Sequence, residues 1–139
     1  MPCDRYKDDP RIQNDADLWR RIPHWHWVPD HNKGGLRPSS AAFEDDKDGN
    51  SMSVFVADAV RQAGKNERDV LEAHQNFALA AVTAGLAREQ KQGVAFEPAQ
   101  LPGHAVVFGK KPRSVSRAFA KEAKWVVAPG GVSATPGQA

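Results

Sequence analysis

The sequence predicts a small single domain of the α+β class, with a mixed or antiparallel sheet and three to four helices. Apolar runs bounded by Gly and Pro are scattered among segments of helical periodicity without strict alternation, which favours α+β over a doubly wound sheet. A length of 139 residues suits one hydrophobic core. We expect that domain at residues 16–128, between disordered polar tails at 1–15 and 129–139.

Strand signals come from one turn and several short β-prone runs. The Asp-Gly pair at 48–49 lies between two such runs and predicts a β-hairpin over about 39–56. Apolar runs bounded by Gly or Pro predict strands near 93–97 and 104–108. The second of these runs is apolar on both faces, so we expect it to be central in the sheet.

Helical spacing appears in the middle of the chain and again near its C-terminus. Two short helices are expected over 57–63 and 66–74, the second with Asn66 as its N-cap. The alanine-rich stretch 77–88 favours a third helix, with a strand followed by a turn as the alternative. Apolar residues at steps of four, four and three predict a last helix over 115–126.

Composition and charge limit the compartment and the partners that we expect for the protein. No apolar run approaches the roughly 20 residues that span a bilayer, and the N-terminal segment is polar, so we expect a cytoplasmic protein that does not bind membranes. The single cysteine, Cys3, excludes an internal disulfide and agrees with a reducing compartment. Residues 1–60 carry 8 Lys and Arg against 11 Asp and Glu, whereas residues 61–139 carry 11 against 6. An anionic partner is therefore expected on the second half, although an excess of cations also serves solubility.

One segment combines histidines with a carboxylate. His24, His26, Asp30 and His31 lie within eight positions, and imidazole and carboxylate are ligands for Zn²⁺, Mn²⁺ or Fe²⁺. If Trp25 is extended, the two flanking histidines project from one face about 7 Å apart. The alternative interpretation is an edge in which the indoles pack and the imidazoles meet solvent.

An overlapping set of side chains suits phosphate or carboxylate recognition, since guanidinium groups and hydroxyls bind such anions. It comprises Arg20, Arg37, Ser39 and Ser40, together with Arg21 and the first two histidines. A strand-borne Arg followed by a Ser pair is loosely similar to NAD-using ADP-ribosyltransferase folds. That resemblance implies a nucleotide ligand and a late acidic residue, for which spacing does not distinguish Glu89, Glu97 and Glu122.

A basic stripe marks the last predicted helix. Four cations fall at steps of four, four and three, which places them along one helix face: Arg113, Arg117, Lys121 and Lys124. Such a stripe can neutralise nucleic-acid phosphates, and it is also typical of a solvated outer face. No P-loop, dinucleotide fingerprint or Gly-x-Ser-x-Gly elbow is present, which excludes several common enzyme classes.

These features lead to two functional hypotheses. The first is an interaction module that binds another macromolecule, a protein in the first instance, through the basic helix or through Trp19, Trp25 and Trp27. The second is a small enzyme with a metal site or a phosphate- or nucleotide-recognising site at residues 20–40. His104 opens the expected central strand, and we expect it to be catalytic only if it lies beside His24 or His26.

Overall fold

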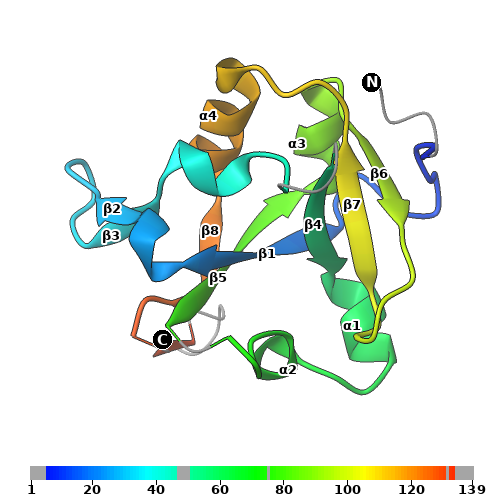
Figure 1. The fold of residues 1–139 in the computed structure, drawn as a ribbon, viewed down its shortest axis with the longest axis horizontal. Helices are drawn as coiled ribbons and strands as arrows, with labels where there is room; N and C mark the ends of the chain where they lie inside the picture. Colours follow the sequence, from blue (N-terminus) through cyan, green and yellow to red (C-terminus); the bar gives the residue numbers. More distant parts are fainter. Residues whose placement is uncertain (1–5, 47–50, 75, 131, 134–139) are drawn as a thin grey trace.

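The computed structural model describes residues 6–46, 51–74, 76–130 and 132–133. Within them it places an antiparallel sheet, a separate two-stranded hairpin, four α-helices and two 3₁₀-helices (Figure 1). The strands are β1 (Asp17–Pro23), β2 (Trp27–Pro29), β3 (Leu36–Pro38), β4 (Ser51–Val56), β5 (Phe77–Thr83), β6 (Gly93–Phe96), β7 (His104–Phe108), β8 (Lys124–Ala128) and β9 (Val132–Ser133). The helices are η1 (His24–His26), η2 (Ser40–Phe43), α1 (Ala57–Gln62), α2 (Glu67–Val70), α3 (Ala84–Glu89) and α4 (Arg113–Glu122).

The sheet has the order β6-β7-β4-β1-β5-β8-β9, and every neighbouring pair is antiparallel. β1 pairs with β5 along its whole length, from Asp17 to Pro23. Its pairing with β4 stops after Leu18↔Val56 and Trp19↔Phe55. Beyond these two pairs β1 and β4 run in different directions, which leaves a fork between the two halves of the sheet (Figure 1).

Arg20 occupies this fork. Its guanidinium donates to the Ser53 carbonyl at 2.8 Å, where a β1 backbone amide would donate if the ladder continued. The same group donates to the carbonyls of Ala42 at 3.0 Å and Glu44 at 3.3 Å, and to Asp46 Oδ1 at 3.2 Å. With the side chain only 14% exposed, burial lowers the pKa of Arg20, and the nearby Asp46 carboxylate opposes that effect.

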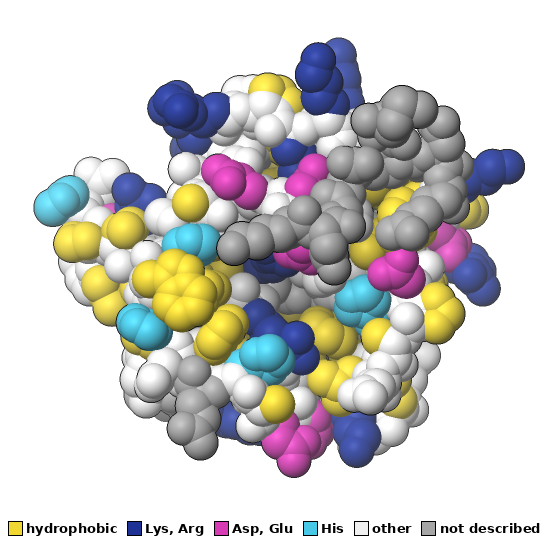
Figure 2. Space-filling model, in the orientation of Figure 1, with side chains coloured by type: hydrophobic (Ala, Val, Ile, Leu, Met, Phe, Trp, Pro, Cys, Tyr) yellow, Lys and Arg dark blue, Asp and Glu magenta, His cyan; other side chains and the backbone are white. Residues whose placement is uncertain are grey.

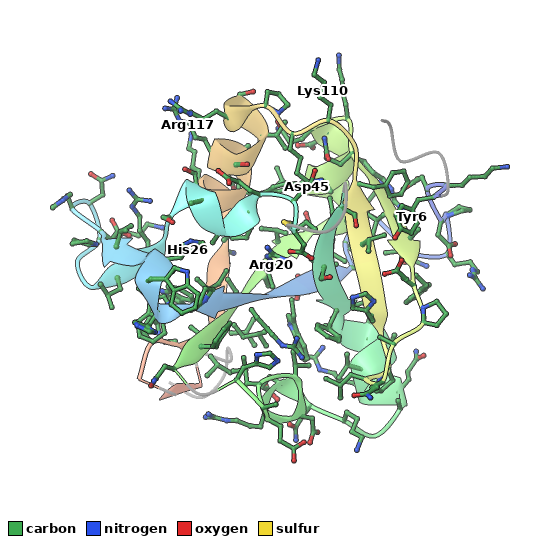
Figure 3. All side chains as sticks on the ribbon, viewed as in Figure 1. Tyr6, Arg20, His26, Asp45, Lys110 and Arg117 are labelled. Atoms are coloured by element: carbon green, nitrogen blue, oxygen red, sulfur yellow. The ribbon has the colours of Figure 1, made fainter. Side chains whose placement is uncertain are left out.

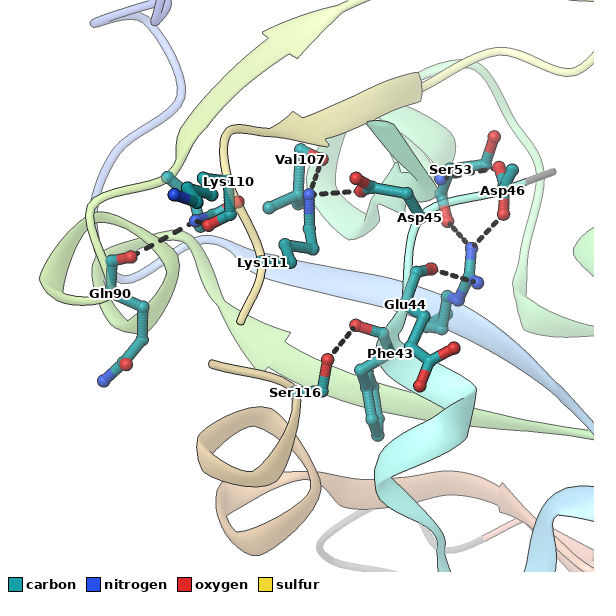
Figure 4. Close-up of polar contacts among 12 residues, drawn as sticks. Phe43, Glu44, Asp45, Asp46, Ser53, Gln90, Val107, Lys110, Lys111 and Ser116 are labelled. Atoms are coloured by element: carbon teal, nitrogen blue, oxygen red, sulfur yellow. Dashed lines mark hydrogen bonds and ion pairs between the residues drawn. The ribbon is translucent and has the colours of Figure 1, made fainter. Parts of the chain in front are cut away.

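A second cation holds the segment 44–46 from the other side (Figure 4). The buried ammonium of Lys111 pairs with Asp45 and donates to the Val107 carbonyl at 2.8 Å. Asp46 accepts from the Ser53 amide at 3.1 Å, and its own amide donates to Ser51 O. This segment is therefore fixed against β4 by charge-assisted bonds in addition to backbone bonds.

The two faces of the sheet bury different elements, because side chains alternate along each strand. One face packs Leu18, Ile22 and Val54 against η2, α3 and α4, with Phe43 and Phe119 in ring contact. The other face packs Trp19, Phe55 and Leu79 against Val60 of α1 and Val70 of α2. Ser53 and Arg21 belong to this second face, because they alternate with residues that the first face buries.

The predicted fold class is confirmed: the domain is α+β with an antiparallel sheet, strands at 93–96 and 104–108, and four α-helices. The predicted hairpin over 39–56 is only partly right. Its second strand is β4, but its first half is the 3₁₀-helix η2, which buries Phe43 and accepts a bond from Ser116 Oγ of α4 at 3.0 Å. The Asp-Gly turn lies outside the described residues, and the two-stranded hairpin is β2–β3.

The other predicted helices differ from the observed helices in where they begin or end. The stretch 77–88 begins as strand β5, as the alternative interpretation expected, but a helix and not a turn follows. This helix is α3, whose N-cap Thr83 accepts from the Leu86 amide. The last helix does not reach residue 126, because Ala123 is extended and the β-prone residues after it pair with β5 as β8. The helix expected over 66–74 is limited to α2, where Asn66 and Asp69 form a capping box.

The described part of the expected N-terminal tail packs onto the sheet. Ile12 is buried, the Asp9 amide donates to Val94 O at 2.8 Å, and Asp8 pairs with Arg88. The polar composition of residues 6–15 did not indicate this packing, which depends on one apolar residue and on bonds to β6 and α3. None of the helices in the described ranges is long and apolar enough to cross a membrane.

We expect Arg20→Met to lower the free energy of unfolding by about 3–5 kcal/mol, because three carbonyls and a carboxylate would lose their common donor in a buried place. Arg11→Met, which removes an exposed arginine paired with Asp9, is the matched control and should leave stability nearly unchanged. Urea denaturation followed by circular dichroism measures both. Equal stability of the two variants would contradict the role given to Arg20.

Candidate functional site

A pocket of about 520 Å³ opens on the second face of the sheet, between the α2–β5 connection and the β6–β7 connection. We call it the Arg21 pocket. Basic side chains (Lys or Arg) and histidines lie close together near the centre of the view in Figure 2. The lining residues are Arg21, Phe55, Asp69, Val70, Glu72, Ala73, His74, Ala99, Gln100, Leu101 and His104.

Arg21 lies over the ring of Phe55, with its guanidinium carbon 4.8 Å from the ring centroid. Its Nε donates to the Val70 carbonyl at 2.8 Å, and no carboxylate in the described parts of the chain pairs with it. Burial lowers the pKa of Arg21, and the positive charge of Arg20 lowers it further. The pocket therefore holds a partly desolvated cation without a counter-charge of its own.

His104 and Ser53 form a hydrogen-bonded pair from neighbouring strands. Nε2 of His104 is 3.2 Å from Ser53 Oγ, and Nδ1 is 3.0 Å from the Glu97 carbonyl. The Glu97 carboxylate lies 3.9 Å from Nδ1 and accepts a bond from the Tyr6 hydroxyl. The Phe55 ring contacts the imidazole edge-on, with centroids 5.4 Å apart, so it stands between His104 and Arg21.

His74 lines the pocket opposite the sheet and contacts Phe77, with ring centroids 5.1 Å apart. Burial lowers the pKa of His74, and the charge of Arg21 contributes in the same direction. The imidazole is therefore neutral at neutral pH, and it can gain a proton more readily when the charge of Arg21 is compensated.

The predicted metal site is not formed. No group of three or more His, Cys, Asp or Glu side chains that could hold a metal ion occurs in the described residues, which include all four predicted ligands. Trp25 is not extended, because η1 spans His24–His26. Asp30 accepts from the amides of Asn32 and Lys33, both at 3.0 Å, and these bonds lower its pKa while holding it within its own turn. His31 is exposed.

The predicted anion-binding set is likewise dispersed. Arg20 is used in the fork, and Arg37 donates to the neighbouring Pro38 carbonyl at 3.3 Å. Ser39 immediately precedes η2, and Ser40 is its first residue. Neither serine lines the Arg21 pocket, and His104 contacts Ser53 rather than His24 or His26.

The predicted interaction residues divide between core and surface. Trp19 is 1% exposed and packs with Phe55 and Val60, so it is wrong as a surface contact. Trp27 is partly buried and donates to the Ile22 carbonyl, whereas Trp25 is 65% exposed. Burial lowers the pKa of the nearby His26, with Arg20 contributing.

The basic stripe is shorter than predicted. Arg113, Arg117 and Lys121 are exposed on α4, and Figure 3 shows Arg117 directed away from the fold. Lys124 lies on β8, so it is not part of the helix face. The charges of this region are spread over open surface.

A larger groove of about 1070 Å³ runs beside α3, α4 and β8. Its cations Arg61, Lys121 and Lys124 are exposed, and Arg61 pairs with Asp58 and lies over Trp19. The groove therefore lacks an uncompensated buried charge. The smaller Arg21 pocket is the better candidate site.

Protein-family models, curated proteins and solved structures yield no match to this chain. The loose similarity to ADP-ribosyltransferase folds thus gains no support from these comparisons.

The two histidines with lowered pKa predict a loss of stability in mild acid. The unfolded chain takes up protons near the ordinary pKa of about 6.5, whereas the folded chain resists protonation at His26 and His74 until lower pH. Their contribution is therefore complete above about pH 6.5 and is lost as the pH falls toward the folded-state pKa values.

Urea unfolding between about pH 7.5 and about pH 5.5 measures this effect. The double variant His26→Asn, His74→Asn should show a shallower decrease than the parent protein, and His31→Asn, at an exposed position, is the matched control. An unchanged slope in the double variant would contradict the assignment.

Proposed function

We propose that the protein binds a small anionic molecule in the Arg21 pocket, with Arg21 as the counter-charge. The observation that carries the proposal is the partly buried guanidinium with one backbone acceptor and no described carboxylate partner. A cation held away from water is costly unless an anion compensates it. A ligand carboxylate or phosphate would supply that compensation through the terminal nitrogens of Arg21.

The walls of the pocket support a ligand with an apolar body beside its anionic group. Phe55, Val70 and Leu101 offer apolar surface, and the Phe55 ring holds the plane of the guanidinium. The two lining carboxylates do not pair with Arg21: Asp69 accepts from the Asn66 amide in the capping box, and Glu72 is exposed. His74 can add a second positive charge once an anion is bound.

Affinity for phenyl phosphate, measured by isothermal titration calorimetry, tests the proposal. Arg21→Met should weaken binding about ten- to hundredfold, because a hydrogen bond to a charged group contributes about 1.5–3 kcal/mol. Arg117→Met on the exposed face of α4 is the matched control and should bind as the parent does. Loss of binding in Arg117→Met but not in Arg21→Met would place the anion on the basic helix and overturn the proposal.

A second candidate function is protein binding through the hairpin side of the molecule. It is favoured by Trp25, which is 65% exposed and stacks edge-on with His24 and Phe77. Large exposed aromatics are frequent anchors at interfaces. Trp25→Ala should leave phenyl phosphate binding unchanged, which separates this surface from the Arg21 pocket.

A further inference from the structure

The bond between Ser53 and His104 has a fixed direction. A backbone carbonyl can only accept, so the 3.0 Å contact to Glu97 O places the imidazole proton on Nδ1 in the neutral ring. Nε2 is then an acceptor, and the Ser53 hydroxyl donates to it across 3.2 Å. This is the arrangement in which an imidazole can remove the hydroxyl proton as general base.

A carboxylate and a tyrosine hydroxyl lie beside the imidazole that would receive the Ser53 proton. The Glu97 carboxylate lies 3.9 Å from Nδ1, on the side of the ring away from Ser53. The Tyr6 hydroxyl and the Glu97 carboxylate are bonded to each other, which restrains the carboxylate. Ser53 itself is held by both backbone groups, through its amide to Asp46 and its carbonyl to Arg20. Nucleophile, base and orienting group are thus present in one chain.

From this geometry we infer that the protein catalyses an esterase-type acyl transfer, with Ser53 as nucleophile and His104 as general base. His104 lines the Arg21 pocket, where the substrate would bind, and Ser53 lies next to that pocket through its 3.2 Å contact with His104. The inference rests on the proposed binding of an anion by Arg21. Ser53 Oγ attacks the carbonyl carbon of a carboxylic ester while its proton passes to His104 Nε2. The C–O bond to the leaving alcohol breaks, and the alcohol oxygen takes the proton from Nε2.

The second half of the reaction consumes water and restores the enzyme. Nε2 removes a proton from a water molecule, whose oxygen attacks the acyl carbon on Ser53. The bond to Oγ then breaks and Oγ regains the proton, which releases the carboxylic acid. The net reaction is ester plus water to acid plus alcohol, with no redox change.

The spacing of the site indicates the substrate class. Phe55 separates the two ends of the site, at 4.8 Å from the Arg21 guanidinium and 5.4 Å from the His104 ring. An anionic group bound to Arg21 would lie across the Phe55 ring from His104, so we infer a spacer of several atoms between that group and the ester carbonyl. The geometry fits an ester whose acyl chain carries a remote carboxylate, as in the half-ester of a dicarboxylic acid.

The test uses two para-nitrophenyl esters of matched chain length, the adipic acid half-ester and the hexanoate. We expect release of para-nitrophenol from the half-ester at least tenfold faster than from the hexanoate. The acyl group should be found on Ser53 by peptide mass spectrometry after acid quenching. Ser53→Ala should lower the rate by at least a hundredfold, whereas Ser39→Ala, outside the site, is the matched control and should be fully active.

The outcomes separate the two proposals. Normal phenyl phosphate binding without acylation of Ser53 in the parent protein would overturn the esterase inference and leave the anion-binding function standing. Acylation of Ser53 at equal rates by both esters would overturn the inferred substrate class. Absence of phenyl phosphate binding in the parent would overturn the proposed function, independently of any variant.

Discussion

The guanidinium of Arg20 stands where hydrogen bonds between β1 and β4 would otherwise continue. Two strands that part in mid-sheet leave carbonyl groups without amide donors, and unsatisfied buried carbonyls are costly. Arg20 supplies donors to Ser53 O and to the chain between Ala42 and Asp46. Arg20 thereby links η2, the segment 44–46 and Ser53 in one set of hydrogen bonds, which Lys111 and Ser116 reinforce from the other side.

The two consecutive arginines of β1 have different surroundings, because successive side chains of a strand point to opposite faces of the sheet. Arg20 has its acceptors within the protein and serves the fold, whereas Arg21 has one carbonyl and the Phe55 ring. Burial lowers the pKa of both arginines, and the charge of Arg20 lowers the pKa of Arg21 further, whereas Asp46 opposes the effect of burial at Arg20. In the proposed function, the partly buried guanidinium of Arg21, which no described carboxylate pairs with, would receive its counter-charge from a bound anion. The same face carries the Ser53–His104 pair, so the proposed binding site and the inferred nucleophile lie on one face of the sheet.

Sequence patterns predicted what depends on local chemistry and failed where long-range packing decides. The runs 93–97 and 104–108 were recognisable because Gly and Pro bound them, and they became β6 and β7. The end of the last helix was not recognisable, since Lys124 continues the helical spacing and only pairing with β5 makes it a strand residue. The histidines of residues 24–31 suggested a metal by density alone, but η1 and the Asp30 turn direct them apart. Ser53 lies in a mostly apolar strand and its partner is 51 residues away, so only the register of β4 with β7 brings the pair together.

The most direct test is to determine which nitrogen of the neutral His104 ring carries the proton. The proposed role of Ser53 as nucleophile requires that proton on Nδ1. Long-range ¹H–¹⁵N correlation spectroscopy of the imidazole, in the neutral form, distinguishes the two tautomers. The account predicts the Nδ1–H tautomer, with Nε2 free to accept from Ser53 and its chemical shift altered in Ser53→Ala. An Nε2–H tautomer, or a spectrum unchanged by Ser53→Ala, would contradict the account and leave His104 as a structural residue of the sheet.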